Sequence, residues 1–271
     1  MSKPDSITHV LYHANCADGF GAALAAWKVL GSRAEYVPVR HGDEPPELPA
    51  DAHVAIVDFS YLREALLAVK DKVASLIVLD HHKSASDQMD GLDFAHFDMA
   101  KSGARMAWEF WHPGQELPEL LAYVEDRDLW RWALPESREV SMALHCYPSD
   151  FDVWSSLSMD DLRTEGRAIM RFQTQLLSRA VSRARLTKLG EHEIPVVNSC
   201  LFQSELGDEL CKLYPDAPFA GVYYVTKEGR EAWSLRSIGE FDVAEVAKPF
   251  GGGGHRNAAG FARDAPGVAP C

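Results

Sequence analysis

The sequence is short of cysteine and lacks any long apolar run, and each shortage excludes a class of protein. Its five cysteines contain no CxxC pair and no even set that would form a disulfide framework. We therefore expect reduced thiols in a cytoplasmic protein. The first residues, MSKPDS, lack the apolar core of a signal peptide. No apolar run approaches the ~20 residues of a membrane span, so we expect no membrane partner.

Basic residues are also scarce. The chain has 27 lysines and arginines against 40 aspartates and glutamates, which gives a net charge of −13. A surface this acidic does not attract long nucleic acid without sequence preference. A phosphate-containing substrate would therefore be small, and a metal or a few basic side chains would have to meet its charge locally.

The first part of the chain alternates short apolar runs with helical segments. The pattern predicts strands over residues 9–13, 35–39, 51–59, 75–79 and 93–97, and helices over residues 20–30, 61–72, 102–111 and 117–128. Strands that alternate with helices at this spacing favour a parallel sheet covered on both faces. The predicted fold class is therefore α/β.

The composition changes towards the end of the chain. One long helix is predicted over residues 160–188, and short β-like runs with a single helix follow from residue 193. We divide the chain into a first domain (1–150), a linker helix region (151–192) and a smaller α/β domain (193–271). The long helix carries a concentration of basic residues, which we interpret as a solvated face rather than as a surface that steers substrate.

Polar side chains stand where the predicted strands and helices end. Asp80, His81 and His82 directly follow the strand 75–79, and the other candidate ligands are His13, Asp18, Asp58, Asp126 and Asp128. The carboxyl ends of parallel strands meet at one edge of a sheet, where ligands bind. A mixed set of carboxylates and imidazoles suits Mn²⁺, Fe²⁺, Co²⁺ or Zn²⁺ better than Ca²⁺. The set is large enough for two ions ~3.5–4 Å apart.

Each candidate ligand has a structural alternative when it is taken alone. Asp58 can cap a following helix, and Asp126 and Asp128 can pair with Arg127 and Arg131. Taken together, so many carboxylates would repel one another strongly without bound cations. The set as a whole therefore favours a metal site.

A glycine run near the end of the chain has two interpretations. Residues 251–254 are all glycine and precede His255. Such a run can be a flexible hinge, but small residues also let a backbone close on a ligand and offer its N–H groups to an anion. Arg236 is a second candidate phosphate contact, through its planar guanidinium.

Five short sequence motifs follow one another along the chain. They are the HxxxxDG turn of residues 13–19, Asp58 at a strand end, the Asp80-His81-His82 triplet, the EDRD cluster of residues 125–128, and the GGGH of residues 252–255 followed by AAG at 258–260. With these stretches the chain resembles the DHH phosphoesterases that carry a C-terminal DHH-associated domain, among them nanoRNase-type and linear-dinucleotide-hydrolysing members. The resemblance covers nearly the whole chain. It implies a catalytic metal-binding domain and a substrate-binding domain that face each other across a cleft.

The resemblance also implies roles for single residues. It places one ion, usually manganese, among His13, Cys16 and Asp58, and a second among Asp18, Asp58, His81 and Asp126. Asp80 would support this set, and His82 would face the phosphate, so these two are the expected catalytic residues. The implied substrate-binding residues are Arg236, Gly252, Gly253, Gly254, His255 and Asn257.

Two positions depart from the family pattern or leave it ambiguous. Cys16 stands where the family usually has an aspartate, and it follows His13 at a spacing one residue shorter. It is either a thiolate ligand, which would favour softer metals, or a small packing residue. Either Asp126 or Asp128 can be the fourth-motif ligand, and the offset to Trp130 favours Asp126.

The resemblance implies a two-metal phosphodiesterase that hydrolyses very short oligonucleotides or linear dinucleotides, such as pGpG, to mononucleotides. A phosphatase acting on 3′-phosphoadenosine 5′-phosphate and a cyclic-dinucleotide phosphodiesterase are alternatives within the family. A nucleotide-binding sensor without turnover, on the same fold, is an alternative of another class. Divalent transition metals other than manganese and a homodimeric assembly are also left open.

Overall fold

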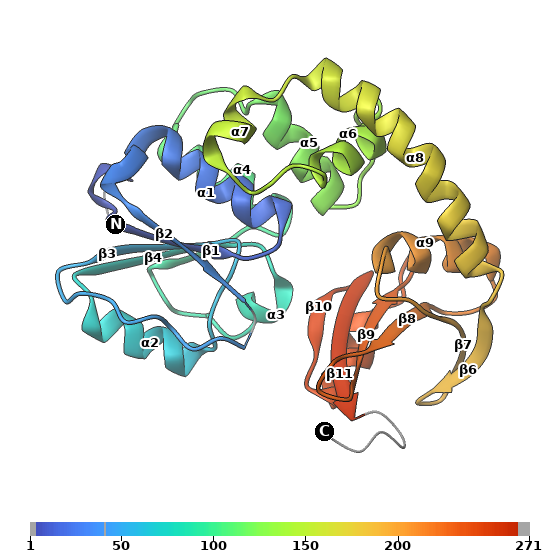
Figure 1. Cartoon of the computed structure of the whole chain (residues 1–271). Helices are drawn as coiled ribbons and strands as arrows, with labels where there is room; N and C mark the ends of the chain where they lie inside the picture. Colours follow the sequence, from blue (N-terminus) through green and yellow to red (C-terminus); the bar gives the residue numbers. More distant parts are fainter. Residues whose placement is uncertain (1–3, 41, 265–271) are drawn as a thin grey trace. The chain divides into compact units, whose positions relative to one another are not determined.

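The computed structural model describes residues 4–40 and 42–264 (Figure 1). The chain divides into two compact units, Met1–Met170 and Arg171–Cys271. Among the described residues, no helix combines the length and the apolar character needed to cross a membrane. We keep the three-part division at residues 150 and 192 as a proposal about function.

The first unit is built on a parallel sheet of five strands in the order β2-β1-β3-β4-β5. Its strands are β1 (His9–His13), β2 (Glu35–Val39), β3 (His53–Val57), β4 (Ser75–Asp80) and β5 (Ala95–Phe97). The predicted α/β class and parallel sheet are confirmed. The strands with the longest apolar runs, β3 and β4, lie inside the sheet, where both faces are buried.

Helices cover both faces of this sheet (Figure 1). On one face, α1 (Ala17–Leu30), α4 (Gly103–Trp111) and α5 (Glu119–Asp128) share a core with alternate strand residues such as Ile77. On the other face, α2 (Arg63–Lys72) packs with residues such as Val78. The short helices α3 (Lys83–Ser86), α6 (Ser137–Leu144) and α7 (Phe151–Ser156) complete the unit.

The predicted long helix is shorter than the sequence pattern indicates. Helix α8 covers Met159–Val181, and the chain then turns into strand β6 (Arg185–Leu189). The prediction of helix beyond residue 181 is therefore wrong, because β6 pairs with β7 (His192–Asn198) in an antiparallel hairpin. On α8 itself, Arg163 and Arg167 form ion pairs with Glu119 and Glu136, which favours a structural role for these two cations.

The second unit is built on a mixed sheet of six strands in the order β10-β11-β9-β8-β7-β6. The further strands are β8 (Ala220–Val225), β9 (Arg230–Arg236), β10 (Gly253–His255) and β11 (Ala258–Asp264). Strands β7 and β8 are parallel, whereas the other neighbours in this sheet are antiparallel. Helix α9 (Gln203–Leu213) belongs to the core on one face, and α10 (Val243–Ala247) belongs to the core on the other.

Candidate metal centre

The turn between β1 and α1 brings the first candidate ligands together. His13 ends β1, Cys16 takes the N-cap position of α1, and Asp18 lies in its first turn. Gly19 permits this tight turn, because a Cβ there would lie 2.2 Å from the backbone oxygen of His13. The side chain of Asp18 is buried.

Asp58 directly follows β3 and holds a central position. Its φ angle is 55°, which is unusual for a residue other than glycine, and its N–H donates to the oxygen of Leu79 at 2.9 Å. Its Oδ1 lies 3.1 Å from Nε2 of His81, and its Oδ2 lies 3.4 Å from Nδ1 of His13. The strained backbone therefore aims one buried carboxylate between two imidazoles.

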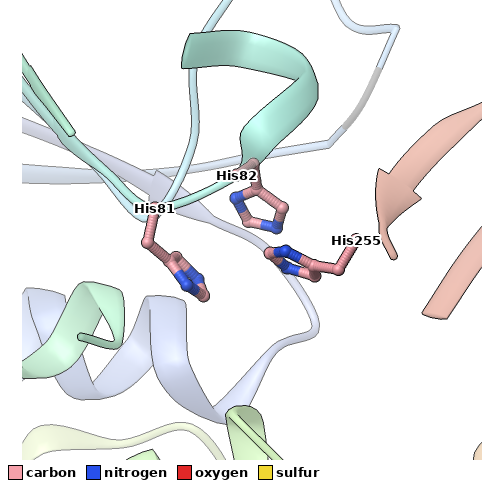
Figure 2. Close-up of side chains that lie close together, drawn as sticks. All are labelled: His81, His82 and His255. Atoms are coloured by element: carbon pink, nitrogen blue, oxygen red, sulfur yellow. The ribbon is translucent and has the colours of Figure 1, made fainter. Parts of the chain in front are cut away.

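The Asp80-His81-His82 triplet stands where β4 ends. Oδ1 of Asp80 accepts hydrogen bonds from the N–H of His81 at 2.7 Å and from Nδ1 of His82 at 2.7 Å. Figure 2 shows the rings of His81 and His82 beside each other, and their centroids are 4.6 Å apart. Asp80 thus orients both histidines, and it leaves Nε2 of His82 as the ring atom directed away from this support.

The structure separates Asp126 from Asp128. Oδ2 of Asp128 lies 3.5 Å from Nε2 of His81. Asp126 faces a different part of the chain. Its two oxygens accept hydrogen bonds from the N–H groups of Ala133 at 2.9 Å and Leu134 at 3.2 Å. Residues two apart on a helix face different sides. The structure therefore brings Asp128, rather than the expected Asp126, to the other candidate ligands, and the choice of the metal ligand between them stays a prediction.

The first turn of α4 also takes part in this region, which the sequence did not indicate. The N–H groups of Gly103 and Ala104 donate to the carboxylate of Asp18, at 2.5 Å and 2.9 Å. A Cβ at Gly103 would lie 2.5 Å from Cβ of Asp58 and 2.9 Å from Oδ2 of Asp18. The N-cap serine followed by glycine, at residues 102 and 103, was the signal that could have revealed it.

Besides the set of Asp58, Asp80, His81 and His82, the candidate ligands of the first unit form two groups. Within each group the donor atoms lie within 4.8 Å of one another. The first group is His13, Cys16 and Asp58, and the second is Asp18, His81 and Asp128. Asp58 also reaches the second group through His81. The two groups of donors therefore meet at one carboxylate.

The pKa values in the cluster show strong coupling between its charges. Burial and the charges of Asp58 and Asp128 raise the pKa of Asp18 well above its usual value. Burial and the same charges raise the pKa of the Cys16 thiol. Burial lowers the pKa of His81, but its contact with Asp58 and the nearby carboxylates outweigh this and raise it to about 10. These shifts favour the protonated forms of Asp18, Cys16 and His81, whereas the contacts of Asp58 with His13 and His81 outweigh its burial and lower its pKa.

A divalent cation fits this set of donors. Oδ2 of Asp80 and Oδ2 of Asp128 are buried and accept no hydrogen bond from any residue that the structure describes. Buried carboxylate oxygens normally have a partner, so these atoms are suited to contact a cation or its water. The combination of imidazole, carboxylate and thiol donors suits divalent transition metals.

The predicted substrate-binding residues all lie in the second unit. Arg236 ends β9, where Nη2 donates to Oγ of Ser204 at 2.5 Å. Asn257 donates from Nδ2 to Oγ of Ser237 at 2.9 Å. His255 ends β10. Their contacts with substrate stay a prediction.

The glycine run differs from the expected anion-binding loop. Gly253 and Gly254 pair with β11, opposite Gly260 and Ala259. The N–H of Gly252 donates to the oxygen of Ala247 at 3.1 Å. A Cβ at Gly252 would lie 2.1 Å from the oxygen of Gly260, so the small residues let the chain approach itself. Gly252 does not form part of an open nest of N–H groups, because its own N–H is bonded to Ala247.

Comparisons with known proteins agree with this architecture. No family model matches the chain. The chain is 30% identical over 285 residues to the uncharacterized protein R106 of Acanthamoeba polyphaga mimivirus, which covers 95% of this chain and 68% of that protein. It is 24% identical over 217 residues to the oligoribonuclease NrnB of Bacillus subtilis. This alignment covers 68% of this chain. The match spans 51% of NrnB, about half of its length.

Two solved structures share the fold. One is PggH, a pGpG-specific phosphodiesterase from Vibrio cholerae, with a TM-score of 0.54 and 14% identity over 95% of this chain and 93% of that one. The other is an exopolyphosphatase-related protein from Bacteroides fragilis, with a TM-score of 0.58 and 18% identity over 98% and 88% of the two chains. The chain belongs to the DHH phosphoesterase family. The triplet for which the DHH family is named is Asp80-His81-His82 in this chain.

Proposed function

We propose that this DHH protein is a metal-dependent phosphodiesterase that hydrolyses very short oligonucleotides or linear dinucleotides, such as pGpG, to mononucleotides. The names of NrnB and PggH support an activity on short nucleotides. The acidic net charge supports a small substrate rather than a long strand. We propose manganese as the metal, in a protein of the cytoplasm.

The convergence of two donor groups on Asp58 is the observation that carries this proposal. His13, Cys16 and Asp58 would hold one ion, and Asp18, His81 and Asp128 with Asp58 would hold the other. Two such ions neutralise charge on a phosphate and activate water for in-line attack on phosphorus. We propose Asp128 in place of Asp126 as the ligand from α5, since Asp126 is engaged by Ala133 and Leu134.

His82 would act on the phosphate through Nε2. Burial lowers the pKa of His82, but the hydrogen bond to Asp80 outweighs it, so the pKa lies above its usual value. A protonated ring with Nδ1–H directed at Asp80 presents Nε2–H to a phosphate oxygen or to the leaving oxygen. Asp80 fixes this orientation, so its loss would misplace the donor even with the ring intact.

Residues of the second unit would hold the end of the substrate away from the cut. The guanidinium of Arg236 is braced by Ser204, which suits it to grip a terminal phosphate in one orientation. We propose that His255 and Asn257 assist in this grip. A grip on the terminal phosphate would favour very short substrates over long ones.

A panel of short substrates tests the proposal. Protein loaded with Mn²⁺ is expected to release mononucleotides from di- to tetranucleotides, and chelation of the metal is expected to stop the reaction. His81→Asn is the matched variant, because it keeps a polar side chain of similar size and removes a metal ligand. Fully metallated protein that cleaves no dinucleotide, cyclic dinucleotide or bisphosphate would defeat the proposal of an enzyme.

A further inference from the structure

Arg236 and His255, two of the proposed substrate contacts, lie in one row of the sheet in the second unit. Ala258 of β11 pairs with Arg236 of β9 on one side and with His255 of β10 on the other. Side chains of directly opposed residues point to the same face of a sheet. Because neighbouring strands are about 4.8 Å apart, the Cα atoms of Arg236 and His255 lie about 10 Å from each other. A ligand held by both side chains would therefore span the small side chain of Ala258.

The contacts of Arg236 identify the face to which this row points. Nη2 of Arg236 donates to Oγ of Ser204 in α9, and a Cβ at Gly207 of α9 would lie 2.6 Å from its Cγ. Ala259, the next residue along β11, belongs to the core that includes α10 on the opposite face. His255 and Ala258 therefore face the same side of the sheet as α9. The spacing of the row depends on how the end of β9 is held against the end of β10.

A short connection follows each of these two strands. Residues 237–242 lead from β9 to α10, and residues 256 and 257 form the turn between β10 and β11. In the first connection Ile238 is exposed, and Gly239 has a φ angle of 81°. Packing of Ile238 in the core therefore does not fix the connection at this point, and hydrogen bonds have to hold it.

Hydrogen bonds join the two connections at both ends of residues 237–242. The N–H of Ser237 donates to the oxygen of Asn257 at 3.2 Å, and the N–H of Val243 donates to the oxygen of Arg256 at 2.7 Å. The buried hydroxyl of Ser237 donates to the oxygen of Phe241 at 2.7 Å. The start and the end of the first connection are thus held against the turn between β10 and β11.

The side chain of Asn257 holds the middle of the same connection. Its Nδ2 donates to Oγ of Ser237 at 2.9 Å and to the oxygen of Gly239 at 3.0 Å. A side-chain amide has two N–H donors, and these two contacts use both of them. Asn257 stands two residues after His255, and the residues that it contacts begin one residue after Arg236. It therefore joins the two halves of the row through the chain itself.

We infer that Asn257 is a positioning residue, which sets the spacing between Arg236 and His255 by joining the connection after β9 to the turn after β10. This inference rests on the proposed function, in which Arg236 and His255 grip the end of the substrate. Asn257 then acts on the substrate through these two residues and not by its own contact. Its loss would loosen the grip and leave the chemical step, which belongs to the metal centre, unchanged.

A double-mutant cycle tests this role. Asn257→Ala and Ser237→Ala are each expected to raise KM for pGpG about fivefold with little change in kcat, and the double variant is expected to match the more affected single variant. Glu240→Gln is the matched control, because it removes an exposed ion pair with Arg256 on the same connection and should keep KM. Effects that multiply in the double variant, or a wild-type KM in Asn257→Ala, would overturn the inference.

Binding of GMP separates this inference from the proposed function, because GMP has a terminal phosphate but no phosphodiester to cleave. In calorimetric titrations of the full chain loaded with Mn²⁺, the variants are expected to show the same pattern in Kd. That pattern in a protein that cleaves no dinucleotide would uphold the positioning role and defeat the proposed function. Cleavage of pGpG with an unchanged KM in Asn257→Ala would do the reverse.

Thermal denaturation of each variant shows whether it is folded. Asn257→Asp takes the place of Asn257→Ala if the latter unfolds, because aspartate keeps the shape of the side chain and loses both donors. It is expected to raise KM in the same way. Wild-type protein that neither binds GMP nor cleaves pGpG would overturn both the positioning role and the proposed function.

Discussion

Oδ1 of Asp58 lies 3.1 Å from Nε2 of His81, with both side chains buried at the edge of the parallel sheet. The other oxygen of Asp58 lies 3.4 Å from His13, which belongs to the neighbouring donor group. One carboxylate therefore joins two groups of candidate ligands that would otherwise be separate. The metal content of the protein should depend on this residue more than on any single neighbour.

Asp58→Asn is expected to remove both ions rather than one. The amide keeps the shape of the side chain but loses the negative charge and one acceptor oxygen. Metal content measured by mass spectrometry should fall from about two ions per chain to almost none. Glu64→Gln, an exposed carboxylate on α2, should leave the content unchanged. Retention of one tightly bound ion in Asp58→Asn would show that the groups are independent.

Substitution of Asp126 and Asp128 should have opposite consequences. Asp128→Asn is expected to lower activity by about 100-fold or more with little change in stability, because a metal ligand is weakened. Asp126→Asn is expected to keep the metal and to destabilise the unit by about 1–2 kcal/mol, because one of two backbone N–H groups loses its acceptor. Activity, metal content and denaturant unfolding measured on both variants distinguish the roles. The reverse pattern would restore Asp126 as the ligand.

Cys16 decides which metals the first donor group prefers. If its thiolate binds the ion, the Co²⁺-loaded protein should show a sulfur-to-cobalt charge-transfer band in the near ultraviolet, because soft sulfur donors favour such metals. The band should disappear in Cys16→Asp, while the metal content is kept and the preference moves towards Mn²⁺. Cys16→Ala should lose one ion. An identical spectrum in wild-type protein and Cys16→Asp would make Cys16 a packing residue.

Arg236 is expected to act on substrate binding more than on the chemical step. Arg236→Ala should raise KM severalfold with a smaller change in kcat, because the proposed contact is remote from the cut. Arg236→Lys should recover little, since lysine lacks the planar fork. Gly207→Ala offers an independent check, because its methyl group would lie 2.6 Å from Cγ of Arg236 and would displace the side chain without removing it. A kcat effect larger than the KM effect would move Arg236 into the catalytic step.

Chelation of the metal should lower the thermal stability of the first unit. Three carboxylates, those of Asp18, Asp58 and the partly exposed Asp128, would then remain close to His81 without a cation. At a metal concentration 100-fold above Kd, binding stabilises the folded state by about 2.7 kcal/mol. This corresponds to a loss of about 5–10 °C in Tm after chelation. Differential scanning calorimetry with EDTA, followed by addition of Mn²⁺, measures the loss and its recovery.

The sequence predicted the architecture well because the relevant signals are local. The apolar runs ending at His13, Asp58 and Asp80 identify strands, and a parallel sheet brings their ends to one edge. The choice between Asp126 and Asp128 was not local. It depends on which side of α5 faces the sheet. Packing against α1 and α4 determines this side, and the EDRD sequence alone does not indicate it.

Two other features also depended on distant parts of the chain. The helical pattern of residues 160–188 continues into residues that form a strand, because a hairpin partner at β7 outweighs local helix propensity. The contact of Gly103 with Asp18 joins residues 85 positions apart, and the serine and glycine at residues 102 and 103 indicate a helix start but not its distant partner. The glycines of β10 let β11 lie close to them. Composition alone does not distinguish this packing role from an anion-binding site.

Main-chain contacts in the first turn of α4 help to fix two carboxylates of the candidate metal centre. Asp18 is tied to two backbone amides, and Asp58 is fixed by a left-handed backbone angle and by close contact with Gly103. The positions of these two carboxylates are therefore held by main-chain contacts as well as by their side chains. If each carboxylate contacts an ion, the fold limits how far apart the two ions can lie, independently of donor chemistry.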